Sequence, residues 1–170
     1  AETYCSSIGA EFMYVRNRIR RDWVKNHMES NRNRTDFPDE KRKFILQKLS
    51  EAVLFEKFIH SRFPGQKRFS LEGSENLIPG LQSLINIGLD NGVKEFTIGM
   101  AHRGRLNVLA NILRKPASQI FTEFAGKVYD DDTLLGDVKY HLGFTSTYIN
   151  EGRECKITLA PNPSHLEAVD

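Results

Sequence analysis

The sequence has few of the features that mark several common classes of protein. Its two cysteines, Cys5 and Cys155, lie far apart and form no CxxC pair, which argues against a zinc ribbon or a dithiol redox motif. No apolar run approaches the ~20 residues of a membrane-spanning helix, because the longest, residues 77–89, is interrupted by proline, glycine and polar residues. The net charge is only +2, so no global field favours nucleic acid or another polyanion. We therefore expect buried free thiols in a reducing compartment, and no membrane or nucleic-acid partner.

Well-known catalytic signatures are missing as well. The chain contains no GxGxxG, Walker or GxSxG sequence and no internal repeat. The acidic run at residues 130–132 is not expected to bind metal, because three consecutive carboxylates cannot easily converge on one ion and no EF-hand spacing follows. What is present, 39% hydrophobic and 27% charged residues in a chain of 170, is typical of one globular domain.

The two ends of the sequence suggest a piece of a longer polypeptide. Residue 1 is alanine rather than an initiator methionine, no signal peptide follows, and residue 170 comes directly after what should be the start of a helix. We therefore expect part of any active site to lie outside these 170 residues.

Residues 1–64 are expected to form a helical N-terminal region. In a first helix, apolar residues recur at three- and four-residue steps, which predicts one apolar stripe. The arginines of this segment favour a solvated or inter-subunit face, with a nucleic-acid-binding face over residues 16–34 as the alternative. The stripe of this first helix consists of Phe12, Val15, Ile19, Trp23 and Val24.

A second helix should begin near Asp39 and end before Pro64. It should carry an apolar stripe that is interrupted by the single charge of Glu56.

Residues 65–170 alternate between expected helices and strands. Helices are predicted over residues 74–90 and 106–113 and from residues 116 and 164 onward, and strands over residues 93–100 and 154–159. This order indicates a parallel sheet covered by helices, so we predict an α/β fold. Ligands bind such sheets at the carboxyl ends of the strands. Residues 102–103 and 164–165 both follow strand ends and should therefore share one rim.

Three of the five histidines lie in segments rich in turn-forming residues: 99–107 (GMAHRGRLN), 136–143 (GDVKYHLG) and 162–167 (NPSHLE). In the first segment a helix start offers unpaired amides to an anion, Arg103 and Arg105 add forked cationic donors, and His102 titrates near neutral pH. An anion site and an ordinary turn with solvated arginines are equally favoured there. Taken alone, the other two segments favour a local loop around His141 and a simple helix cap at Ser164.

Five stretches of the sequence are similar to a known family. They follow one another in the family's order at about its spacing, they span essentially the whole chain, and the last three in combination are highly specific. They are residues 4–11 (YCSSIGAE), 67–73 (KRFSLEG), 99–109 (GMAHRGRLNVL), 136–143 (GDVKYHLG) and 162–168 (NPSHLEA). On these residues the chain closely resembles the E1 component of 2-oxoglutarate dehydrogenase complexes.

The resemblance implies an oxidoreductase of the tricarboxylic acid cycle, linked to glycolysis, that uses thiamine diphosphate and magnesium. Such an enzyme decarboxylates 2-oxoglutarate and passes the succinyl group to the lipoyl arm of the E2 component. The cofactor supplies the chemistry, and the protein supplies orientation and electrostatics. Residues 65–170 would then be the first part of a thiamine diphosphate-binding α/β domain, truncated at its C-terminus. A homodimer in its full-length form, in the bacterial cytoplasm or the mitochondrial matrix, is implied as well.

Carried over position by position, the resemblance assigns a role to each motif. His102 and His141 are expected to be catalytic and to face the dicarboxylate substrate. Thr145, which stands where some members of the family carry serine, and Ser164 are expected at the substrate too. No metal ligand is expected, because the family's magnesium-binding aspartate and asparagine lie beyond residue 170, as does the second domain, whose glutamate activates the cofactor of the partner subunit. The expected cofactor contacts are Arg103, near the diphosphate, with Ser164, His165 and Leu166.

The same motifs leave alternatives open. A 2-oxoadipate dehydrogenase or a 2-oxoglutarate decarboxylase would share them, and a non-catalytic module that binds anions or nucleic acid is a candidate of a different class. Because the metal site and the second domain are expected elsewhere, the 170-residue chain should not turn over substrate unaided.

Overall fold

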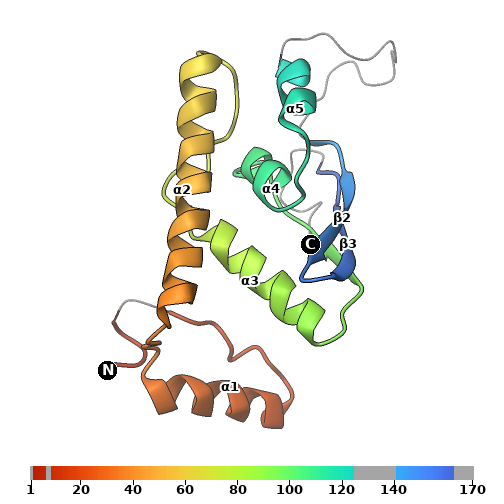
Figure 1. Ribbon diagram of the computed structural model, residues 1–170. Helices are drawn as coiled ribbons and strands as arrows, with labels where there is room; N and C mark the ends of the chain where they lie inside the picture. Colours follow the sequence, from red (N-terminus) through yellow and green to blue (C-terminus); the bar gives the residue numbers. More distant parts are fainter. Residues whose placement is uncertain (1, 7–8, 125–140, 163–170) are drawn as a thin grey trace. The chain divides into compact units, whose positions relative to one another are not determined.

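The computed structural model describes residues 2–6, 9–124 and 141–162 (Figure 1). The chain divides into two compact units, Ala1–Arg42 and Lys43–Asp170, and each is described by itself. The helix expected from residue 164, the acidic run at residues 130–132 and most of the loop expected over residues 136–143 lie outside the described residues.

The first unit contains helix α1, Arg18–Asn31. The helix begins where it does because the side chain of Asn17 accepts a hydrogen bond from the backbone N–H of Arg20 at 3.1 Å, as an N-cap residue does. It ends at Arg32, which adopts a left-handed conformation with φ of 54°. Three hydrogen bonds, each 2.8 Å long, hold the N-terminal residues against this helix and its C-terminal end. Tyr4 donates to Glu29, Arg32 donates to Glu2, and the side-chain amide of Asn33 donates to the carbonyl of Thr3.

The apolar stripe predicted for the first helix is wrong. The cap at Asn17 leaves Phe12 and Val15 outside the helix. Ile19 and Trp23 are 82% and 66% exposed, and Trp23 stacks on the ring of His27 with 5.3 Å between ring centroids. Trp23 is therefore not a core residue of this unit. The only residue of α1 that is buried is Met28.

Helix α2, Asp39–Arg62, begins and ends as the sequence predicts. From Lys43 onward it belongs to the second unit. Its predicted stripe is buried or half-buried, and Ala52, Glu56 and Ile59 are its fully buried members. Three shorter helices follow: α3 is Leu77–Asp90, α4 is Arg105–Asn111 and α5 is Ala117–Phe124. None of the helices in the described ranges is both long and apolar enough to cross a membrane.

The start of α3 differs from the prediction by three residues. Ser74 is not the capping residue, because the helix begins at Leu77 and Asn76 directly precedes it. The carbonyl of Ser74 accepts the N–H of Leu77 at 3.0 Å in the turn before the helix. Asn76, the residue before the helix, makes no side-chain capping hydrogen bond.

Within the described residues, the sheet has three strands in the order β1-β3-β2. β1 is Glu95–Ile98, β2 is Phe144–Asn150 and β3 is Arg153–Leu159. β1 and β3 pair in parallel, so the predicted α/β fold with parallel pairing is confirmed. β2 pairs antiparallel with β3, which the sequence did not predict, and the sheet is therefore mixed. Glu151 and Gly152 join these two strands, and both have positive φ (50° and 75°), as a two-residue hairpin turn requires.

The core of the second unit lies between this sheet and the helices. α3 contacts both β3 and α4 (Figure 1). Residues with 0% or 1% exposure come from each layer, such as Ile78 and Ile85 of α3, Leu109 of α4 and Ile157 of β3. Burial of each such side chain contributes about 1.5–3 kcal/mol. This packing holds the sheet in place, and the candidate site lies at the edge where β1 and β3 end.

Candidate functional site

The strands that precede residues 102–103 and 164–165 end at the same edge of the sheet, although residues 164–165 themselves lie outside the described residues. Ile98, the last residue of β1, stands opposite Leu159, the last residue of β3. One residue further, the N–H of Ala160 donates to the carbonyl of Ile98 at 2.9 Å. Phe144, the first residue of β2, also stands opposite Leu159. The segments that follow β1 and β3 and the segment that precedes β2 therefore meet at one edge of the sheet.

Two of the predicted site residues, His102 and His141, lie side by side at this edge. Their ring centroids are 6.0 Å apart and their planes are inclined by 32°. His102 is half-buried and His141 is 2% exposed. The carbonyl of His141 accepts the N–H of Asn162 at 2.9 Å, so the start of the third histidine motif joins the same edge.

The environment of His102 favours its neutral form. Its ring packs on Phe69, with 4.0 Å between the ring centroids. Burial lowers the pKa of His102 below its ordinary value, and the nearby charges of His141 and Arg103 lower this pKa further. A neutral imidazole keeps one N–H donor and one acceptor nitrogen. At neutral pH, His102 is therefore equipped to donate one hydrogen bond or to accept a proton.

Phe69 is held against His102 by its backbone. Its carbonyl accepts the N–H of Gly104 at 2.8 Å, and Gly104 has a φ of +80°. A Cβ atom on Gly104 would lie 2.5 Å from Cδ1 of Leu71, so only glycine fits this close approach without displacement. The N–H of Arg105 is also occupied, because it donates to the carbonyl of His102 at 3.1 Å. The expectation that this helix start offers free amides to an anion is thus wrong for these two positions.

The two arginines of the first histidine motif have different surroundings. Arg103 is exposed, and its Nη1 lies 3.5 Å from the carbonyl oxygen of Ser70. Arg105 is 0% exposed and donates to the backbone carbonyls of Met100, Leu142 and Ala160. The expectation that Arg105 adds a forked donor for oxyanions is therefore wrong, because its guanidinium is buried and bonded to backbone carbonyls, whereas Arg103 has the exposure that such a role needs.

The remaining predicted residues divide into those the structure describes and those it does not. Thr145, the second residue of β2, is exposed, and its hydroxyl oxygen lies 3.2 Å from that of Thr158 on the neighbouring strand. It lies at the same end of the sheet as the histidine pair. Ser164, His165 and Leu166 lie outside the described residues.

Asn162 lies at the same edge, although the sequence patterns did not single out its side chain. It is 1% exposed, and within the described part of the chain its side-chain amide has no hydrogen-bond partner. A buried amide without a partner costs about 1–3 kcal/mol, so a polar group is needed beside it. The signal was available in the sequence, because Asn162 begins the third histidine motif.

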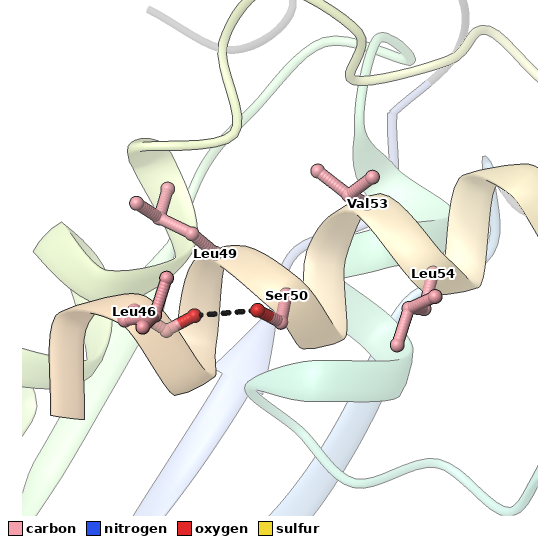
Figure 2. Close-up of a pocket in the computed structure, with 5 residues that line it drawn as sticks. All are labelled: Leu46, Leu49, Ser50, Val53 and Leu54. Carbon is pink, nitrogen blue, oxygen red and sulfur yellow. Dashed lines mark hydrogen bonds between the residues drawn. The ribbon is translucent and has the colours of Figure 1, made fainter. Parts of the chain in front are cut away.

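Neither a metal site nor a second catalytic pocket is found in the described residues. Across residues 2–6, 9–124 and 141–162, no three histidine, cysteine, aspartate or glutamate side chains are grouped so that they could hold a metal ion. Figure 2 shows a groove of about 360 Å³ on α2, lined by Leu46, Leu49, Ser50, Val53 and Leu54. Its one polar side chain, Ser50, donates to the carbonyl of Leu46 at 2.8 Å, so the groove presents no group for catalysis.

The geometry therefore defines a class of protein: an α/β chain whose parallel strands end in a cluster of imidazole, guanidinium and amide groups suited to an anionic ligand. Comparison with known proteins gives the particular relatives. The chain is 49% identical over 169 residues to the 2-oxoglutarate dehydrogenase E1 component of Cupriavidus necator. It is 45% identical over 170 residues to the proteins of the same name from Brucella canis and Brucella suis.

These matches cover 99% of the chain but only 17–18% of each relative. The chain is thus homologous to one segment of proteins named 2-oxoglutarate dehydrogenase E1 component, which confirms the resemblance found in the sequence. It spans less than one fifth of their length. No family model matches the chain.

Proposed function

We propose that this chain forms part of the active site of a thiamine diphosphate-dependent 2-oxoglutarate dehydrogenase E1. The observation that carries the proposal is the pairing of His102 and His141, 6.0 Å apart, at the carboxyl-end edge of the sheet. In α/β proteins this edge is where ligands bind. The proposed reaction removes the C1 carboxyl of 2-oxoglutarate as carbon dioxide and transfers the remaining succinyl group to a lipoyl sulfur of E2, with reduction of the lipoyl disulfide.

The chemistry of the histidine pair suits a dicarboxylate substrate. The lowered pKa of His102 favours a neutral ring, whose single N–H can donate to a carboxylate oxygen without leaving a cation in a half-buried place. A hydrogen bond to a charged carboxylate contributes about 1.5–3 kcal/mol, enough to orient the substrate. His102 and His141 are therefore the proposed catalytic and substrate-binding pair, with Thr145 and Ser164 as further substrate contacts.

The residues present fit the proposed cofactor. The exposed guanidinium of Arg103 is a forked donor of the kind that binds phosphate oxygens, and the buried amide of Asn162 needs a polar neighbour. Arg103, Ser164, His165 and Leu166 are the proposed cofactor contacts. When bound, thiamine diphosphate supplies the carbon nucleophile and accepts the electron pair released by decarboxylation. The protein's part is to orient the substrate and to exclude water.

The names of the relatives support a wider proposal about partners, compartment and domains. The lipoyl-bearing E2 succinyltransferase, a second copy of the full-length polypeptide and a magnesium ion bound by residues beyond this segment are the proposed partners. The compartment is the bacterial cytoplasm, or the mitochondrial matrix in a eukaryote. Residues 1–64 are the proposed helical N-terminal region, and residues 65–170 the start of the cofactor-binding domain.

Two substitutions in the full-length protein test this assignment. His141→Ala should lower kcat/KM for 2-oxoglutarate by about 10- to 100-fold, the effect of one charged hydrogen bond, and should leave thiamine diphosphate affinity nearly unchanged. Arg103→Ala should weaken cofactor affinity. Arg153→Met serves as the control, because Arg153 is a half-exposed residue at the hairpin end of the sheet that forms ion pairs with Asp90 and Glu151. Unaltered kinetics in both site variants would refute the site.

Substrate choice is tested with the wild-type protein. Turnover of 2-oxoglutarate and of 2-oxoadipate should be compared with lipoyl-E2 as acceptor, and succinyl-lipoyl E2 identified by mass spectrometry. Equal or better use of 2-oxoadipate would favour the related dehydrogenase, and carbon dioxide release without succinyl transfer would favour a decarboxylase. The 170-residue chain alone should release no carbon dioxide, with or without magnesium.

A further inference from the structure

Among the described residues of the second unit, Arg105 is the largest side chain that is fully buried. It is the first residue of α4 and is 0% exposed. Burying a guanidinium costs several kcal/mol unless its donors are satisfied. Burial also lowers the pKa of Arg105, but from so high an ordinary value that the group remains charged. A buried cation at this position therefore needs a reason other than packing, since an apolar side chain of similar volume would fill the core at lower cost.

The hydrogen bonds of this guanidinium supply the reason. Nη1 donates to the carbonyl of Met100 at 2.9 Å. Nη2 donates to the carbonyl of Leu142 at 3.2 Å and to that of Ala160 at 2.9 Å. These three carbonyls belong to three separate segments: one follows β1, one precedes β2 and one follows β3. A single planar group thus connects all three segments that meet at the edge of the sheet.

Each connected segment carries part of the candidate site. Met100 stands two residues before His102, Leu142 directly follows His141, and Ala160 stands two residues before Asn162, whose N–H in turn donates to the carbonyl of His141. The two histidines are not held together by a direct strand pairing, because His102 follows β1 and His141 precedes β2, and these strands are separated by β3. The hydrogen bonds of Arg105 therefore connect the segment after β1 with the segment before β2, which no pairing between these two strands does.

We propose that Arg105 is a positioning residue that sets the separation of His102 and His141. The rigid fork of a guanidinium reaches carbonyls in different directions at once, whereas the single ammonium nitrogen of lysine cannot reproduce that geometry. Only the expected fall in kcat/KM rests on the proposed function. The effect of Arg105 on the distance between the two histidines concerns this chain alone.

The test compares three variants of the full-length protein that contains this segment. Arg105→Lys keeps the positive charge but loses the forked guanidinium. Arg105→Met keeps much of the side-chain volume but loses both the charge and the guanidinium. Arg153→Met is the control, because it removes an arginine from the hairpin end of the same sheet. Circular dichroism and thermal melting establish which variants fold. A crystal structure of each folded variant without cofactor or substrate gives the distance between the two imidazole centroids, which is 6.0 Å in the native arrangement.

In Arg105→Lys, we expect this distance to change by about 1 Å or more and kcat/KM for 2-oxoglutarate to fall by about 100-fold, the size of effect that a 1 Å misplacement produces. Affinity for thiamine diphosphate should change little, which a general loss of structure would not allow. Arg153→Met should match the wild type in all three measurements.

An unchanged distance in Arg105→Lys, or an equal change in Arg153→Met, would overturn the proposal. Loss of the fold in both Arg105 variants would also overturn it, because Arg105 would then be needed for the fold rather than for the site. If Arg105→Met alone fails to fold, Arg105→Lys decides. If the wild-type protein does not turn over 2-oxoglutarate, the proposed function fails, and the distance measurement still decides the role of Arg105.

Discussion

Glu56 is a buried charge that connects segments near the site, and replacing it should destabilise the protein strongly. Its side chain is 5% exposed and forms an ion pair with Arg68 at 3.1 Å. The same carboxylate accepts the N–H of Leu71 and the side-chain amide of Asn107, each at 3.1 Å. These bonds tie α2 to α4 and to the segment at residues 68–71, which carries Phe69 against His102.

The size of the effect follows from these contacts. Removing one partner of a buried ion pair costs about 3–5 kcal/mol, and each buried donor left unsatisfied costs about 1–3 kcal/mol. Arg68 keeps bonds to the carbonyl of Glu56 and to His60, and its side chain is 16% exposed, so the lower end applies. We expect Glu56→Ala to lower the free energy of unfolding by about 3 kcal/mol. Glu56→Gln keeps a carbonyl oxygen for Leu71 and Asn107 and should cost about 1 kcal/mol.

Urea unfolding of the 170-residue chain, followed by far-UV circular dichroism, measures these differences. Glu154→Ala on β3 is the control, because Glu154 is exposed, and its effect should stay within about 0.5 kcal/mol. Hydrogen exchange at the amide of Leu71 should accelerate in Glu56→Ala. A loss of less than about 1 kcal/mol in Glu56→Ala would refute the reasoning, because the buried network could not then be holding the segment.

Three further outcomes are expected. Gly104→Ala should destabilise the chain by about 1–3 kcal/mol in the same urea assay, because it places a side chain at φ +80° and 2.5 Å from Leu71; an unchanged midpoint would contradict this. Because the pKa of His102 is lower in the folded state, the unfolded state binds more protons below about pH 6.5, and the free energy of unfolding should fall as the pH drops from there. Phe69→Ala exposes the ring of His102 and should therefore weaken this pH dependence, which urea titrations at several pH values would measure. Burial raises the pKa of the Cys155 thiol, so iodoacetamide should modify it only when the chain is unfolded, as mass spectrometry of native and urea-treated samples would show.

Much of the fold could be predicted because its signals are local. The stripe of α2, with Glu56 as its single charge, follows from helical periodicity. The strand β1 follows from the alternation of polar and apolar residues in its sequence EFTI, in which Phe96 and Ile98 are half-buried and the other two residues are exposed. β2 was missed because its consecutive polar residues Thr145, Ser146 and Thr147 show no alternation of polar and apolar side chains. Its strand structure depends on pairing with β3, which the sequence of β2 alone does not show. The stripe of α1 was wrong because the periodicity begins before the cap at Asn17, and capping, not periodicity, decides where that helix starts.

The candidate site was predictable only in part. Strand order places His102 and His141 at one edge, and residue type makes both candidates for anion binding. The opposite surroundings of Arg103 and Arg105 could not be read from the sequence, since both follow the same strand and both are forked donors. Arg105 donates to one nearby carbonyl, that of Met100, and to two carbonyls from distant segments, those of Leu142 and Ala160. Such long-range hydrogen bonds leave no local pattern in the sequence.

The central claim is that His102 and His141 face one negatively charged ligand at the edge of the sheet. The most direct test is a crystal structure of the full-length protein with thiamine diphosphate, magnesium and a phosphonate analogue of 2-oxoglutarate. The account predicts that oxygens of the analogue lie within about 3.2 Å of nitrogens of both imidazoles. An analogue bound elsewhere in an intact assembly, with both rings remote from it, would contradict the account.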